Sequence, residues 1–223
     1  MIGMLVMILA AVSPLELENN GRLAEAGAAW QREGSMQGQA RIMCRFLEEA
    51  LYAGEGERAL LLIRELGSVC ADSALVRYWR ARVAWSAGLP ELAADELQQI
   101  STDDPWLHHR ALGTAALYRG NGPEATRQFI LATAAAGTAR KQFWSGIDLC
   151  SAYLLDSDVQ QALVLSELLV HSYPGDPMAQ VMYGLCLHES GQYSRAYETL
   201  SGISAESPAA GRLAYILMEG FEQ

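Results

Sequence analysis

Apolar residues follow the three- and four-residue spacing of amphipathic helices along most of this chain, in pairs of segments that a glycine separates. In the clearest pair, Tyr183 and Leu187 precede Gly191, and Ala196 and Leu200 follow it. This spacing places the apolar side chains on one face of a helix. No stretch of six residues shows the alternation with β-branched residues that is typical of a strand. The pattern predicts an all-α protein.

A glycine followed five residues later by an alanine recurs along the chain at a nearly constant interval. The copies are Gly21 and Ala26, Gly54 and Ala59, Gly88 and Ala93, Gly120 and Ala125, and Gly191 and Ala196. A sixth copy ends at Ala162 and has Ser157 in place of the glycine. The alanines are 33, 34, 32, 37 and 34 residues apart. A period near 34 predicts stacked helix–turn–helix units, with the glycine in the turn and the small alanine packed early in the second helix.

The unit resembles the tetratricopeptide repeat (TPR), whose pattern is aromatic-x2-Leu-Gly-x2-Tyr, then Ala-x3-Phe, then Pro. Matching residues include Leu112-Gly113 with Ala125 and Phe129, and Tyr183-Gly184 with Ala196 and Pro208. The resemblance covers roughly residues 20 to 220. It implies a right-handed α-solenoid of about five TPR-like repeats, with a partial N-terminal repeat and a C-terminal capping helix.

We expect one continuous solenoid domain over residues 14–223, because stacked units share one core. The expected units are approximately 14–39, 40–73, 74–105, 106–142, 143–176 and 177–208, followed by a terminal helix at 209–220. The 37-residue step before Ala162 predicts a longer turn around residues 138–141, where Arg140 and Lys141 form either a contact or a solvated loop. The terminal segment Leu213–Met218 is apolar on most sides, which indicates either a cap or self-association.

The first 12 residues, MIGMLVMILAAV, are apolar without interruption. This run is shorter than the roughly 20 residues that span a bilayer. It fits a signal peptide over residues 1–13, with cleavage near Ala11 or Ser13, although no Lys or Arg precedes it. We therefore expect an exported protein of the periplasm or bacterial cell envelope. A buried first helix, a membrane anchor and a cytoplasmic location are the alternatives.

Charge and cysteine content narrow the partners and the chemistry. The net charge of −10 argues against nucleic acid as the main partner. The four cysteines lack CxxC or metal-ligand spacing, so we expect free buried thiols, with a Cys44–Cys70 disulfide as the alternative in an exported protein. Asp103-Asp104 near His108-His109 is the one carboxylate–imidazole cluster, and no nucleotide-binding or hydrolase motif occurs. We expect no enzyme activity, no cofactor and no metal site.

The resemblance to TPR arrays implies that the first helix of each unit lines a concave groove. Positions transferred from that pattern give a set rich in aromatic and arginine residues, which dominate binding hot spots. The set is Tyr52, Tyr78, Arg82, Trp85, Arg110, Tyr118 and Trp144. We expect it to bind an extended or helical peptide with an acidic group near Arg82 and Arg110. The alternative is that these aromatic residues pack between helices or against a second copy.

Three functions remain open at this point. The first is a protein–protein interaction scaffold or adaptor. The second is a chaperone or assembly factor for a secreted or membrane component, which Ile147, Leu154 and Leu155 favour. The third is an enzyme built on a solenoid, for which no catalytic set is visible.

Overall fold

The computed structural model describes residues 13–19, 23–52, 54–70, 72–174, 176–203 and 208–221. The regular elements within these ranges are all helices. Their bounds are α1 Pro14–Asn19, α2 Leu23–Arg32, α3 Met36–Tyr52, α4 Gly56–Val69, α5 Ser73–Ser86, α6 Pro90–Gln98, α7 Pro105–Tyr118, α8 Gly122–Ala135, α9 Ala139–Leu155, α10 Val159–Ser172, α11 Pro177–Glu189, α12 Tyr193–Ser201 and α13 Pro208–Phe221.

The helices stack as consecutive pairs. Each helix packs against the next along the chain, and the first helices of successive units, here called A helices (α3, α5, α7, α9, α11 and α13), also contact one another. The second helices of the units (α4, α6, α8, α10 and α12) are the B helices. This is a TPR-like array of helix pairs with a short first unit, α1 and α2, and a last A helix, α13, that caps the C-terminal end.

The turns inside the units have the left-handed backbone that the repeated glycines predict. Gly54, Gly88, Gly120 and Gly191 have φ between 70° and 78°, and Ser157 has φ 61° in the glycine-less unit. In each turn the positive-φ residue and its successor donate backbone hydrogen bonds back into the last turn of the A helix, as Gly120 does to Leu117 and Asn121 to Ala116. Gly21 lies outside the described residues. Gly34, between α2 and α3, has the same conformation, which the repeat pattern did not indicate.

The recurring alanine is fully buried in every unit. Ala26, Ala59, Ala93, Ala125, Ala162 and Ala196 have no accessible surface. A second close approach lies at the glycine of the A helix: a Cβ on Gly113 would come within 2.6 Å of the Phe129 ring, and one on Gly184 within 2.6 Å of Leu200. These positions explain why the period is visible in the sequence, since a larger side chain at any of them would separate A from B.

The additional residues near position 140 lengthen a helix and not a turn. The connection between α8 and α9 is only residues 136–138, and α9 is 17 residues long where α7 has 14. Thr138 starts α9 because its hydroxyl accepts a hydrogen bond from the Lys141 amide. The expected longer turn around residues 138–141 is therefore wrong, and Arg140 and Lys141 lie in the first turn of α9.

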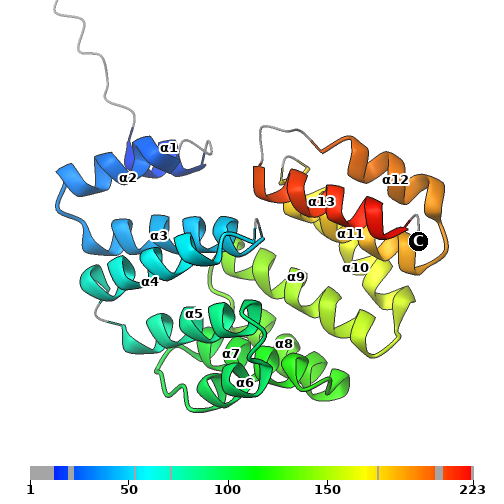
Figure 1. Ribbon diagram of the computed structural model, residues 1–223, viewed down its shortest axis with the longest axis horizontal. Helices are drawn as coiled ribbons and strands as arrows, with labels where there is room; N and C mark the ends of the chain where they lie inside the picture. The colour runs from blue at the N-terminus through cyan, green and yellow to red at the C-terminus, as the bar shows by residue number, and fades with distance from the viewer. Residues whose placement is uncertain are drawn as a thin grey trace, which may run out of the picture.

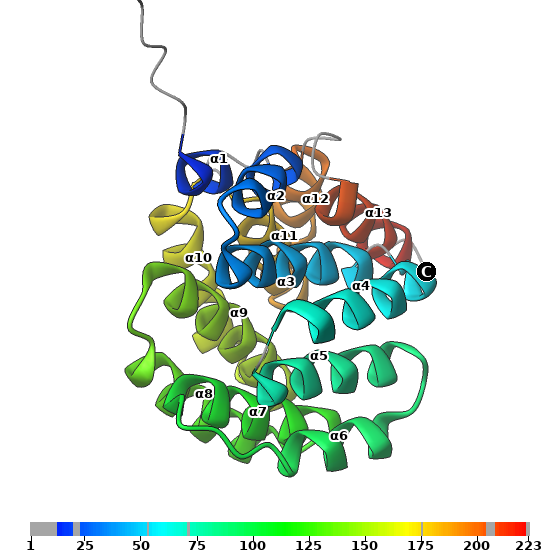
Figure 2. The same ribbon diagram turned by 90° about the vertical axis from the view of Figure 1, so that its left-hand side faces the viewer.

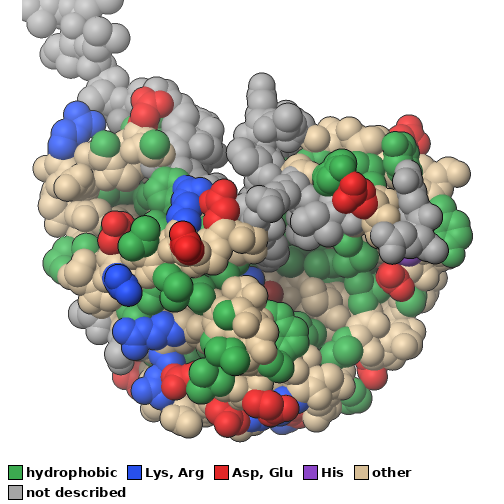
Figure 3. All heavy atoms as spheres, viewed as in Figure 1, with side chains coloured by type: hydrophobic (Ala, Val, Ile, Leu, Met, Phe, Trp, Pro, Cys, Tyr) green, Lys and Arg blue, Asp and Glu red, His purple; other side chains and the backbone are tan. Residues whose placement is uncertain are grey.

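The array curls until its last helix, α13, meets α3 of the second unit. In Figure 1 the helix pairs run around the molecule from α1 to α12, and α13 lies beside α11 near one end of α3. Figure 2 shows the same neighbourhood of α3, α11 and α13 from the side. α13 packs against α11, α12 and α3, and it buries Ala214 with Val181 and Leu200. The space-filling view in Figure 3 shows a hollow near the centre of this face, with hydrophobic side chains around it.

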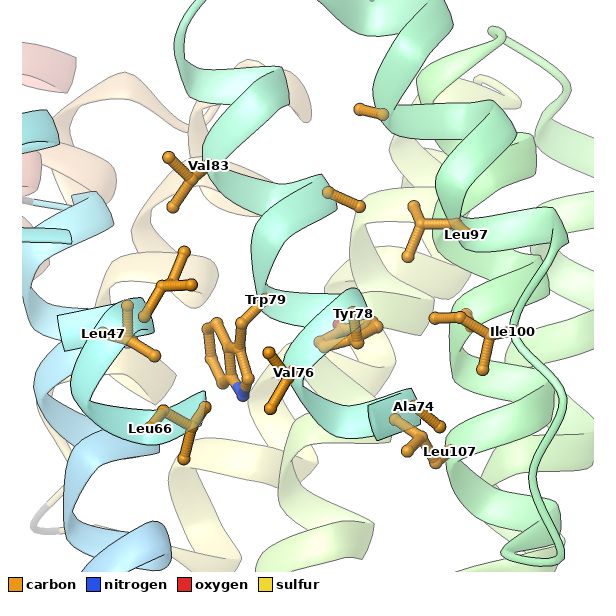
Figure 4. Close-up of a cluster of buried hydrophobic side chains, with 14 of the residues drawn as sticks. Leu47, Leu66, Ala74, Val76, Tyr78, Trp79, Val83, Leu97, Ile100 and Leu107 are labelled. Carbon is orange, nitrogen blue, oxygen red and sulfur yellow. The ribbon is translucent and has the colours of Figure 1, made fainter. Parts of the chain in front are cut away.

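The largest part of the core joins the second unit to the third and fourth. Figure 4 shows Trp79 of α5 directed toward Leu47 and Leu66, which belong to α3 and α4. The neighbouring Tyr78 points the other way, toward the side of Leu97 and Ile100. Adjacent residues of one A helix thus anchor two successive interfaces.

Candidate binding surface on the inner wall and rim

Charged and aromatic side chains from four A helices converge inside the ring. We call this set the inner wall, and it comprises Glu48 of α3, Tyr78 and Arg82 of α5, Arg110 of α7, and Arg140, Trp144 and Asp148 of α9. Helical spacing produces the set, because Tyr78 and Arg82, like Arg140, Trp144 and Asp148, are four residues apart and share a helix face.

Arg110 is the most buried charge of the inner wall, with 3% of its surface exposed. Its Nε donates a hydrogen bond to Oδ2 of Asp148 at 2.5 Å. Its guanidinium carbon lies 5.1 Å from the Trp106 ring centre, 5.2 Å from that of Tyr78 and 5.8 Å from that of Trp144. Burial is the largest influence and lowers the pKa of Arg110, but the charge and hydrogen bond of Asp148, together with Tyr78, raise the pKa above the ordinary value. Arg110 is therefore a structural cation that holds α7 to α9.

Glu48 of α3 faces the same cluster and is 7% exposed. Burial raises the pKa of this carboxyl, although the arginines at positions 110, 140 and 82 oppose the rise. Nη2 of Arg140 lies 3.9 Å from Oε2 of Glu48. Arg140 also donates from Nη1 to Oδ2 of Asp176 at 3.2 Å, which ties α9 to α11. The first turn of α9 thus connects two distant parts of the ring.

A second group of residues lies where α5 and α7 end. Trp85 and Tyr118 stack with ring centres 3.9 Å apart and planes 9° from parallel. Trp85 is 41% exposed and Tyr118 is half-buried. Burial raises the pKa of the Tyr118 hydroxyl, and the nearby Arg82 guanidinium opposes that rise. We call Trp85, Tyr118 and Arg82 the rim. Arg82 belongs to both sets, because it lies where the inner wall borders the rim.

Six of the seven residues expected in a groove therefore fall into two sets. Tyr78, Arg110 and Trp144 are 1%, 3% and 5% exposed. They pack between neighbouring A helices. The rim residues retain accessible surface. Tyr52 ends α3, and its side chain lies outside the described residues.

Sequence reasoning missed the acidic half of this surface. Asp148, the partner of Arg110, and Glu48, the partner of Arg140, were not among the seven expected site residues, and Arg140 was expected only as a contact or part of a solvated loop. The available signal for Asp148 was one carboxylate in the otherwise uncharged run from Trp144 to Leu155. In the leucine-rich face that favours the chaperone alternative, Ile147 is buried, Leu154 is half-buried and Leu155 is exposed.

In the part of the chain that is described, the carboxylate–imidazole cluster and the cysteines take part in structural contacts. No group of three or more His, Cys, Asp or Glu side chains there could hold a metal ion. Asp104 caps α7 and accepts a hydrogen bond from Nζ of Lys141 at 2.7 Å, while Nδ1 of His109 lies 2.9 Å from Oε1 of Gln128. All four cysteines are free; Cys150 and Cys186 are buried, and Cys44 and Cys70 are half-buried. Burial is the main reason that the pKa of Cys44 rises to about 12.

The described helices contain none that is long and apolar enough to cross a membrane. This finding covers the helices from α1 onward. The apolar residues 1–12 lie outside the described part of the chain.

Comparison with known proteins finds solved structures of similar fold, but no protein family that matches in sequence. No family model matches this chain, and no curated protein matches it. Similar solved structures include a variant of a putative kinesin light chain from Podosopora anserina with nearly identical TPR-like repeats (16% identity, covering 86% of this chain and 94% of that one, TM-score 0.48). They also include PilW, a type IV pilus biogenesis factor (14% identity, 92% and 94%, TM-score 0.48), and the TPR domain of P58(IPK) (13% identity, 92% and 67%, TM-score 0.34).

These scores are too low to support an argument about function. The architecture rests instead on this chain's own helix pairs, positive-φ turns and fully buried alanines. Together these features define a TPR-like helical repeat protein.

Proposed function

We propose that this protein is a protein–protein interaction scaffold or adaptor without catalytic activity, and that it binds a peptide segment of a partner protein at the rim. The observation that supports this proposal is the Trp85–Tyr118 stack, which keeps a large aromatic surface exposed beside a half-buried arginine. Exposed aromatic residues next to arginine are the composition of interaction hot spots.

The rim suits a segment that combines an apolar and an acidic side chain. Trp85 is rigidly placed by Tyr118, so little conformational entropy is lost when a partner side chain packs on it. Arg82 is one helical turn before Trp85 and supplies the guanidinium that a carboxylate prefers. Arg110 contributes indirectly, because its Nε already donates to Asp148. The acidic group of the partner is assigned to Arg82 because Arg82 is half-buried, whereas Arg110 is only 3% exposed.

We include a location in the bacterial cell envelope in the proposal, and it rests on the sequence of residues 1–12. α1 begins at Pro14, so cleavage near Ala11 or Ser13 would leave the first helix intact. An intact-mass measurement on protein from its native cells tests this part. Loss of roughly the first 13 residues supports export, and a complete N-terminus contradicts it.

The binding proposal is tested by crosslinked affinity purification from the native cells. The baits are the wild type, the Trp85→Ala/Tyr118→Ala variant and a control, Arg127→Ala, which removes an exposed side chain paired with Glu124 of its own helix. We expect a specific partner with the wild type and the control, and its loss with the double variant at unchanged helicity. Retention by the double variant would show that the rim is not the binding surface.

A further inference from the structure

Two contacts connect parts of the ring that stacking does not require to meet. Units of a helical repeat array normally touch only their neighbours. Here α3 also contacts α13, and Glu48 of α3 lies 3.9 Å from Arg140 of α9. We call these two contacts the seam (Figures 1 and 2).

We propose that the seam is a latch: the ring opens between α3 and the C-terminal helices α9 and α13 while the stacking of neighbouring units stays intact. The closed form described above is then one of two states of the chain. In the open state Glu48 becomes accessible from the mouth of the ring.

The seam is weaker than the interfaces on either side of it. The Glu48–Arg140 pair is at the long limit of an ion pair, and the Arg140 side chain is nearly half exposed. Such pairs contribute about 0–1 kcal/mol. The interface between α3, α4 and α5, by contrast, buries Leu47, Leu66 and Trp79 almost completely. Among the described residues, the buried apolar clusters join α3 to α4 and α5, and α13 to α11 and α12, and none of them spans α3 and α13. Local opening begins where few buried apolar contacts are lost, which favours the seam.

Arg140 keeps most of its partners when the seam opens. Its Nη1 remains bonded to Asp176, and its guanidinium carbon remains 5.2 Å from the Phe143 ring centre and 4.8 Å from that of Trp144. All of these residues belong to α9, or precede α11 directly, and move with Arg140. Glu48 regains water on opening, which relieves the burial that disfavours its charge in the closed ring. Neither partner of the ion pair therefore strongly resists separation.

Opening changes what a partner could reach. Glu48 is only 7% exposed in the closed ring. If the proposed scaffold function is correct, the closed ring offers the rim alone, and the open ring adds the Glu48 carboxylate. The latch itself does not depend on any partner, so it can be tested on the isolated protein.

Spin-label distances across and beside the seam test the latch. Labels on Leu61→Cys of α4 and Tyr197→Cys of α12 report across the seam, since both positions are exposed. Labels on Leu61→Cys and Leu92→Cys, the latter in α6, report stacking within one arm. The full-length background carries Cys44→Ser and Cys70→Ser, because these two thiols are half-buried and could also be labelled.

Arg140→Glu is the opening variant, because it directs a third carboxylate at Glu48 and Asp176. Arg140→Ala is the milder second variant, and Arg127→Glu, an exposed change on α8, is the control. We expect the distance across the seam to lengthen in both Arg140 variants, more in Arg140→Glu, and to stay unchanged in the control. The distance within one arm should not change in any of them. An unchanged distance across the seam in both Arg140 variants, or a change in both label pairs together, would overturn the proposal.

Discussion

Trp85 and Tyr118 stack face to face across two successive units, with ring centres 3.9 Å apart. Both residues are within two positions of the end of their A helix, directly before the turns at Gly88 and Gly120. The repeat therefore places an aromatic pair at the edge of the ring by the same geometry that positions the turns. A structural contact and the proposed binding surface share these two side chains.

The stack should contribute to stability as well as to binding. An aromatic pair contributes about 0.5–1.5 kcal/mol beyond its buried area. A double-mutant cycle with Trp85→Ala, Tyr118→Ala and the double variant, measured by urea unfolding, should give a coupling free energy in that range. Additive effects of the two single substitutions would show that the rings do not support each other.

Breaking the Arg110–Asp148 pair should be strongly destabilising. Asp148→Asn leaves the buried guanidinium without its carboxylate, and we expect a loss of about 3 kcal/mol in the free energy of unfolding. Glu124→Gln, which breaks an exposed pair with Arg127, is the matched control and should change stability little. Chemical denaturation followed by circular dichroism measures both. Equal effects of the two substitutions would contradict the structural role assigned to Arg110.

The turns offer a test at equivalent backbone positions. Gly120 has φ 70° and Ser157 has φ 61°. Gly120→Ala should destabilise by about 1–2 kcal/mol, because alanine is strained at positive φ. Ser157→Gly should be close to neutral, since the strain it relieves is offset by the greater freedom of glycine in the unfolded chain. Thermal unfolding distinguishes them, and a tolerated Gly120→Ala would contradict the turn geometry.

The buried carboxyl of Glu48 should make stability fall as the pH rises. Its pKa is raised in the folded protein, so the folded state holds more protons than the unfolded state between the two values. Stability is then highest at low pH and is lost as the pH rises through the folded pKa. The groups that face Glu48 include Arg82 of α5, Arg110 of α7, and Arg140 and Asp148 of α9.

Glu48→Gln removes this titration. We expect the variant to lose less stability than the wild type when the pH rises from about 4 to about 8. Glu124→Gln is the control of opposite sign, because hydrogen bonds from Arg127 and Gln128 lower the pKa of Glu124. Urea unfolding at a series of pH values measures both variants. If the free energy of unfolding of Glu48→Gln depends on pH as strongly as that of the wild type, groups other than Glu48 are responsible for the dependence.

The sequence predicts the array because local packing leaves local signals. A positive φ selects glycine, as at Gly54 and Gly88, and the closest approach of two helices selects alanine, as at Ala93 and Ala125. The length of α9 was mispredicted for an equally local reason. Thr138 can cap a helix three residues before Lys141, and the spacing of alanines alone does not show whether additional residues join a turn or a helix.

The inner wall could be predicted only in part, because it depends on how far the array curls. Tyr78, Arg110 and Trp144 are correctly placed on A helices, and their burial comes from packing between successive A helices. The Glu48–Arg140 contact joins residues far apart in the sequence. The small rotation between successive units determines that contact, and no single residue encodes it.

Photo-crosslinking in the native cells tests the proposed binding surface most directly. A photoreactive aromatic residue replaces Trp85 in one strain and Arg127, exposed on α8, in another. We predict that position 85 crosslinks a discrete partner protein and that position 127 does not. The same products at both positions, or none at position 85 under conditions where the partner is captured by affinity, would contradict the rim as the binding surface.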